Sequence, residues 1–214
     1  MVRPLILKPK QPDKIKPTKI RYIFKLVHTY FKFTESDEFR KLSIWEQWEC
    51  MQVMSRALYE MVKNSKTDLG ICSLKYYKLR ADKLHNKLGT FEHALRAQHY
   101  FEMSLHPYYR DIFWSDYESA KRLINYSTLG CFTSRKENTK LRGSLDTTEG
   151  IKTIKETTDM NYIKNKIKMV HKDDGSFYES PFDPTEALPD DIRESLNSYD
   201  RLPKKELNLY YKVV

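Results

Sequence analysis

The sequence has few cysteines and few glycines, and each shortage excludes a class of structure. Cys50, Cys72 and Cys131 are an odd number of thiols at wide spacing, which is neither a disulfide framework nor a zinc-ligand pattern. Such cysteines are typical of a reducing compartment, the cytosol or the mitochondrial matrix. Only 6 glycines occur in 214 residues. This scarcity disfavours folds built from many tight turns and favours helices joined by short connections.

No segment is apolar enough to cross a membrane, since no run approaches the roughly 18 consecutive apolar residues that a spanning helix needs. The N-terminus also lacks the continuous apolar region of a secretory signal. The first residues are basic and nearly free of acid, as in a mitochondrial targeting segment, but Pro4, Pro9 and Pro12 interrupt the amphipathic helix that such a segment forms. We therefore expect a chain without a transmembrane span.

Motifs that carry catalysis or bind cofactors are missing as well. The sequence contains no GxGxxG, no GxxxxGK, no HExxH and no GxSxG pattern. The turn sequence Asp173-Asp174-Gly175 lacks the ligand spacing of a calcium-binding loop. We predict that the protein is not an enzyme and that it has no catalytic residues, no cofactor and no metal.

One set of acidic and histidine side chains comes close to a metal-binding pattern. On a helix over 90–105, four of them would share one face: Glu92, His99, Glu102 and His106. A di-iron site in a helical bundle would need Glu-x-x-His pairs from two helices, and no Glu here has a His three residues later. We therefore interpret this set as a polar, solvent-facing surface.

Positive charge is concentrated at the N-terminal end of a chain whose net charge is +9. Residues 1–33 hold nine Lys or Arg against one Asp, whereas residues 173–214 hold five basic and ten acidic residues. A basic head and an acidic tail predict that the head meets a negatively charged partner. RNA, anionic lipid and an acidic protein surface all remain candidates.

The first 18 residues predict an extended arm, because four prolines among lysines prevent a continuous helix. We expect its basic side chains to bind the anionic partner: Arg3, Lys8, Lys10, Lys14 and Lys16. The arm is followed at 19–33 by an amphipathic segment whose basic residues share one helical face: Arg21, Lys25, His28 and Lys32. Its apolar residues share another: Ile20, Phe24, Val27 and Phe31.

Several interpretations of 19–33 stay open. A basic amphipathic helix is typical of a membrane surface or of a groove on a partner protein. The apolar stripe would equally suit packing against the protein's own core. Since the segment is rich in β-forming residues, a strand is also possible, and basic residues between aromatics suit single-stranded RNA.

Hydrophobic spacing over the rest of the chain predicts a mainly α fold, an antiparallel helical bundle with an extended N-terminal arm and an extended acidic C-terminal tail. The predicted helices cover 36–63, 71–88, 90–105 and 107–126, followed by a long loop at 127–149, one or two helices within 150–171 and a short helix at 189–199. The predicted domains are the arm with its amphipathic segment at 1–33, the bundle at 34–126, a loop with one or two helices at 127–172 and the tail at 173–214.

Tyrosine doublets predict contacts with other proteins. Adjacent residues on a helix cannot both face one core, so one tyrosine of each pair should lie near the surface, where Tyr is favoured in interfaces. The residues predicted for this role are Tyr76, Tyr108, Tyr210 and Tyr211.

These features together predict a non-catalytic accessory subunit of a large assembly. The layout of basic arm, helical body and acidic tail is similar in general style to accessory subunits of mitochondrial complexes, although no motif carries this analogy. The first expectation is a respiratory-chain or ATP synthase subunit on the matrix side of the inner membrane, contacting other subunits and anionic lipid headgroups. The alternative is a ribosome-associated or other RNA-binding structural subunit.

Overall fold

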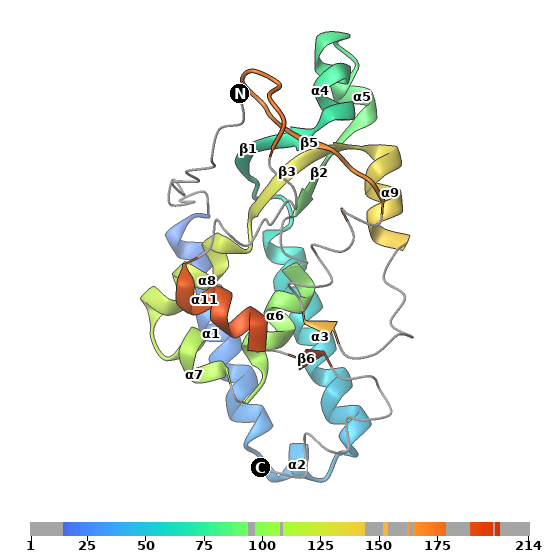
Figure 1. Cartoon of the computed structure of the whole chain (residues 1–214). Coiled ribbons are helices and arrows are strands. Elements are labelled where there is room, and N and C mark those ends of the chain that lie inside the picture. The colour runs from blue at the N-terminus through green and yellow to red at the C-terminus, as the bar shows by residue number, and fades with distance from the viewer. Residues whose placement is uncertain are drawn as a thin grey trace.

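The protein has a mixed α/β fold, so the prediction of a purely helical bundle is wrong. The computed structural model describes residues 15–93, 97–107, 109–143, 152–153, 162, 165–178, 189–198 and 200–201. Within these residues, helices pack around one large core, and a four-stranded sheet with its own helices lies at one end of this helical half (Figure 1).

The helical half is built from segments far apart in the sequence. Its helices are α1 (Pro17–Thr34), α2 (Asp37–Arg40), α3 (Ile44–Val62), α6 (Ala97–Leu105), α7 (Arg110–Trp114), α8 (Tyr117–Tyr126) and α11 (Asp190–Ser198). Residues at the helix N-terminus determine where several of these helices begin. Pro17 opens α1, where a proline has its φ already set and needs no hydrogen-bond donor. Ser43 and Glu46 form a reciprocal capping box at the start of α3.

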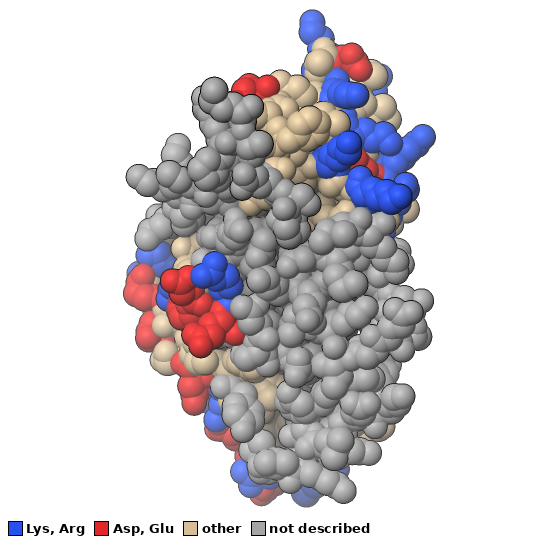
Figure 2. All heavy atoms as spheres, in the orientation of Figure 1, with Lys and Arg blue, Asp and Glu red and all other residues tan. Residues whose placement is uncertain are grey.

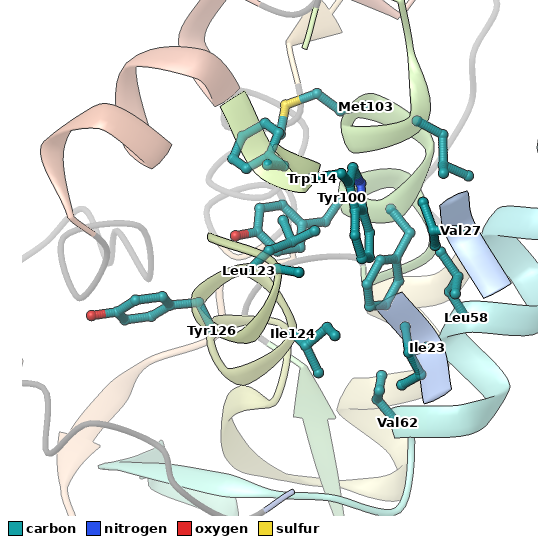
Figure 3. Close-up of a cluster of buried hydrophobic side chains, with 14 of the residues drawn as sticks. Ile23, Val27, Leu58, Val62, Tyr100, Met103, Trp114, Leu123, Ile124 and Tyr126 are labelled. Atoms are coloured by element: carbon teal, nitrogen blue, oxygen red, sulfur yellow. The ribbon is translucent and has the colours of Figure 1, made fainter. Parts of the chain in front are cut away.

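The core of this half lies where α1, α3, α6, α7 and α8 converge (Figure 3). Trp114, Tyr100, Phe101, Leu58 and Leu123 are its largest fully buried side chains. Burying one aliphatic or aromatic side chain of this size contributes on the order of 2 kcal/mol. The core is therefore the main stabilising feature of the helical half.

Segment 19–33 lies within α1, and its apolar residues belong to this core. Ile20, Ile23 and Val27 are buried, and Phe24 and Phe31 pack partly against the same cluster. Of the interpretations that the sequence left open, packing against the protein's own core is the one observed, and the strand alternative is wrong.

The sheet has the strand order β2-β3-β1-β5. Its centre is a parallel pair formed by β1 (Thr67–Ser73) and β3 (Leu129–Ser134). The edge strands β5 (Met169–His171) and β2 (Gly89–His93) run antiparallel to β1 and β3 respectively. A separate two-stranded sheet pairs β4 (Lys152–Thr153) with β6 (Asp200–Arg201).

Helices cover both faces of the four-stranded sheet. Neighbouring strand residues point to opposite faces, and Cys72 packs with Tyr76 of α4 (Leu74–Ala81), whereas Ile71 packs in the same cluster as Leu141 of α9 (Arg135–Gly143). The short α5 (His85–Leu88) leads from α4 into β2. The parallel pair is thus a buried layer between α4 and α9.

The predicted helices fail where these strands lie. The predicted helix at 71–88 is β1 followed by α4 and α5, and the predicted helix at 90–105 is β2 followed by α6. The predicted loop at 127–149 contains β3 and α9, and β5 lies where a helix was expected within 150–171. Strands buried on both faces do not alternate apolar and polar residues, so their sequences resemble helix segments or loops. The predicted helix at 189–199 is confirmed as α11.

Candidate functional site

The carboxyl ends of β1 and β3 meet at one edge of the sheet, because the two strands are parallel. Each strand passes directly into a helix there, β1 into α4 and β3 into α9. Glu137 in the first turn of α9 joins the two junctions. Its Oε2 accepts hydrogen bonds from Ser73 Oγ at 2.6 Å, from Ser134 Oγ at 2.7 Å and from Ser134 N at 3.0 Å. The first turns of α4 and α9 are therefore neighbours.

The Glu137 carboxylate also satisfies the positive ends of these helices. Helix N-termini carry unpaired N–H groups and a partial positive charge, and both favour an anion. Ser73 accepts a hydrogen bond from Tyr76 N, and Ser134 accepts one from Glu137 N, so each serine caps its helix while donating to the carboxylate. An external anion at this edge would have to bind to side chains around Glu137.

Five exposed basic residues lie on the segments that adjoin this position, and we name them the basic edge: Lys75, Arg135, Lys136, Lys166 and Lys168. Lys75 is the second residue of α4, and Arg135 and Lys136 are the first two of α9. Lys168 lies at the end of β1, because Leu74 N donates to its carbonyl at 2.8 Å. None of the five forms an ion pair with another residue of the described ranges.

Positive charge at this edge does not stabilise the local structure. A cation in the first turn of a helix opposes the helix dipole, by roughly 0.3–1 kcal/mol for each exposed charge. Lys75, Arg135 and Lys136 all occupy such first-turn positions. Since no described carboxylate pairs with them, their charges are available to a negatively charged partner.

The rest of the sheet end is basic too. Figure 2 shows Lys and Arg side chains gathered over α4, α5 and α9. The further exposed members of this group are Lys78, Arg80, Lys83, Lys87 and Lys140. In the helical half some basic residues pair with acidic ones, as in Arg122–Asp191 at 2.6 Å and Arg110–Glu35 at 3.2 Å, whereas the exposed lysines of α1 form no ion pair with a described residue. What distinguishes the sheet end is that it gathers exposed cations from several separate segments.

The basic residues predicted from the sequence lie elsewhere. Arg3, Lys8, Lys10 and Lys14 fall outside the described residues. Lys16 and three α1 residues are exposed: Arg21, Lys25 and Lys32. Two members of the stripe contact the protein itself, because the Arg21 guanidinium lies 5.8 Å from the centre of the Tyr117 ring and His28 Nε2 lies 3.0 Å from the Trp114 carbonyl oxygen.

The predicted interface tyrosines are mostly outside the described part of the chain: Tyr108, Tyr210 and Tyr211. Tyr76 is described and is buried. Its ring stacks on Phe132 of β3, with centroids 5.0 Å apart, and its neighbour Tyr77 is only half-buried. Tyr76 therefore belongs to the packing between α4 and the sheet, and it does not lie on the surface of this chain.

The predicted polar face around His106 differs from expectation. Glu92 belongs to β2 and not to the helix of Glu102, and both Glu102 and His106 are buried. The interpretation of this set as a solvent-facing surface is therefore wrong for these two side chains. Among the residues described, no three His, Cys, Asp or Glu side chains are grouped closely enough to hold a metal ion.

Burial of His106 predicts a pH-dependent stability. Desolvation lowers the pKa of His106 to about 4, from an ordinary value of 6.5. The unfolded chain then binds this proton more readily, so the free energy of unfolding should fall as the pH drops from about 6.5 towards 4. Between pH 7 and pH 5 the loss attributable to His106 is about 2 kcal/mol.

Urea unfolding of the wild type and of His106→Asn at a series of pH values checks this expectation. The carboxylates titrate in both proteins, so the difference between the two curves isolates the histidine. The difference should shrink as the pH falls through this window, and two parallel curves would contradict the assignment.

The buried thiols are poorly suited to nucleophilic chemistry. Burial raises the pKa of Cys72 to about 11 and that of Cys131 to about 12. A thiol must be ionised to act as a nucleophile or a metal ligand. At neutral pH both side chains are protonated and act as small apolar groups.

The sequence contains no local signal for the basic edge. Its five residues come from three separate segments, and only the pairing of β1 with both β3 and β5 brings them to one edge. Comparisons with protein-family models, with curated proteins and with solved structures gave no match. In the described part of the chain, every helix is too short or too polar to cross a membrane.

Proposed function

We propose that this protein is a non-catalytic RNA-binding subunit of a larger assembly and that its basic edge binds phosphate groups. The observation that carries the proposal is the set of five exposed cations at one edge of the sheet, without carboxylate partners among the described residues. Three of them occupy helix positions where positive charge is unfavourable for folding. An RNA backbone supplies the negative charges that this edge lacks.

The physical basis of binding is the release of counterions from the RNA. Each phosphate neutralised by a Lys or Arg frees a condensed cation, so affinity falls steeply as salt rises. Arg135 can hold two oxygens of one phosphate, whereas the four lysines act as mobile point charges. This combination favours binding along a backbone without reading its base sequence.

The membrane-associated form of the accessory-subunit hypothesis rested on segment 19–33. Its apolar residues are occupied by the protein's own core, so they are not available to insert into lipid. It remains a prediction that the protein belongs to a larger assembly, that this assembly lies at the mitochondrial inner membrane and that the protein contacts its other subunits. The RNA-binding form is better supported because it depends on side chains that are exposed.

Two triple variants of equal charge test the proposal. Arg135→Gln, Lys136→Gln and Lys168→Gln together remove three charges from the basic edge. Lys19→Gln, Lys25→Gln and Lys32→Gln remove three exposed charges from α1. Fluorescence anisotropy with a labelled oligouridylate over a salt series gives the affinity and its salt dependence for each protein.

We expect the basic-edge variant to bind about tenfold more weakly at low salt, taking about 0.5 kcal/mol for each exposed ion pair. The slope of log affinity against log salt should fall by about 2, since each single-stranded phosphate contact contributes about 0.7. The α1 variant should change little. A larger loss of RNA affinity in the α1 variant would place the phosphate-binding site on the basic residues of α1. Absence of RNA binding by the wild type would overturn the proposal.

A further inference from the structure

Phe177 lies beside the basic edge on a short hairpin that continues from β5. After β5 the chain turns at 172–175 and returns, with His171 N donating to Ser176 O at 2.9 Å and Tyr178 N donating to Met169 O at 3.0 Å. Phe177 forms a bridge opposite Val170. Side chains directly opposite each other in antiparallel strands share a face, so Phe177 extends the α4 face of the sheet outward, past Val170.

The Phe177 ring is exposed and lies next to a cation. Phe177 is 53% exposed, whereas Val170 opposite it is fully buried. Lys168 of the basic edge has its Nζ 6.0 Å from the ring centre. A single exposed aromatic residue is ordinary, but this one stands beside Lys168, which has no acidic partner among the described residues.

The hairpin that carries the ring is held firmly. Asp174 Oδ1 accepts hydrogen bonds from Ser176 N at 2.9 Å and from Ser176 Oγ at 2.6 Å. Gly175 adopts φ +72°, and a Cβ there would lie 2.7 Å from the Tyr77 ring of α4. Because the turn packs against α4 in this way, the backbone that carries the ring is positioned before any ligand arrives, which reduces the entropy lost on binding.

We propose that Phe177 is a base-stacking platform and that the ligand of this surface is single-stranded RNA. The inference rests on the proposed function and deepens it. A single strand exposes the faces of its bases, and an aromatic ring beside lysines can stack on a base while the lysines hold the adjoining phosphates. In a duplex the base faces are covered by neighbouring pairs, so Phe177 would have no base to stack on.

The test compares single-stranded and duplex RNA of equal length. Phe177→Ala removes the ring, and Phe177→Trp keeps an aromatic ring on the hairpin. Tyr22→Ala is the matched control, because Tyr22 is 60% exposed but lies on α1 in the helical half. The probes are a labelled oligouridylate and a labelled duplex, and circular dichroism checks that each variant is folded.

We expect Phe177→Ala to weaken single-strand binding about tenfold and to leave duplex binding unchanged. Phe177→Trp should retain single-strand affinity, and its tryptophan fluorescence should be quenched when the oligouridylate binds. Tyr22→Ala should match the wild type. If the wild type binds RNA but Phe177→Ala weakens both probes equally or neither, this inference fails and the phosphate-binding function stands. If the wild type binds neither probe, both proposals fail.

Discussion

Replacing Gly130 by alanine should lower the free energy of unfolding by about 3 kcal/mol, because the sheet has no room for a side chain there. A Cβ at this position would lie 2.3 Å from the Glu92 carbonyl oxygen and 2.5 Å from a carbon of the Phe91 ring. Gly130 lies in β3, whose residues pair with β2 on one side and with β1 on the other. Neither neighbouring backbone can retreat without breaking ladder hydrogen bonds.

Gly70→Ala is the matched comparison for this prediction. Gly70 has φ +76°, which is unfavourable for alanine, but a Cβ there would meet no atom within 4 Å. The free energy of unfolding should therefore fall by only about 1 kcal/mol, the cost of the unfavourable backbone conformation. Urea unfolding followed by circular dichroism measures both variants. A loss in Gly130→Ala no greater than that in Gly70→Ala would show that β2 and β3 do not approach as closely as described.

Ile23→Ala should also cost about 3 kcal/mol, since it leaves a cavity in the core of the helical half. Ile23 is fully buried between α1 and the other helices, as Figure 3 shows. The adjacent Tyr22 is 60% exposed, so Tyr22→Ala should change stability by less than about 0.5 kcal/mol. Thermal or urea unfolding of both variants provides the comparison.

This pair also separates the two uses of α1 that the sequence allows. If the apolar stripe served a membrane or a partner, Ile23→Ala would spare the stability of the isolated chain and would weaken that association. A stable Ile23→Ala protein would therefore contradict the packing of α1 in the core. A destabilised one would support it.

The helices of the helical half were the most predictable part of the fold. The apolar residues of α3 recur at helical intervals, so a helix over 36–63 was expected where α2 and α3 are found. The capping box of Ser43 and Glu46 begins α3 as a separate helix within that range. Segment 19–33 could be assigned as amphipathic but not as helix or strand. Its apolar spacing suits a helix whereas its many β-forming residues suit a strand, and only the core formed with α6, α7 and α8 decides between them.

The sheet could not be predicted because its strands are short and buried on both faces. The sequence of β1 has Ile71 and Cys72 pointing to opposite faces, and both are buried, so the alternation that reveals a half-exposed strand is absent. Gly89 directly follows the predicted helix at 71–88, and Gly130 lies within the predicted loop at 127–149. In the structure a backbone oxygen and an aromatic ring lie close to each of these glycines, and no local sequence pattern predicts such close contacts.

The basic edge was hidden for the same reason. Net charge along the chain points to the N-terminal arm, since its basic residues lie close together in sequence. Lys75, Lys136 and Lys168 are scattered among acidic and apolar residues, and their proximity depends on strand pairing. Electrostatic sites assembled by topology are in general invisible to charge counts along the chain.

The burial of α1 also has a consequence for synthesis of the protein. The contact between His28 and Trp114 joins residues 86 apart, and the Thr67–Thr128 hydrogen bond that precedes the parallel pair joins residues 61 apart. During translation, α1 therefore emerges long before α7 and α8 exist to cover it. In that interval its apolar and basic faces are both exposed, so the nascent chain, unlike the folded protein, has the surface of a lipid-binding helix.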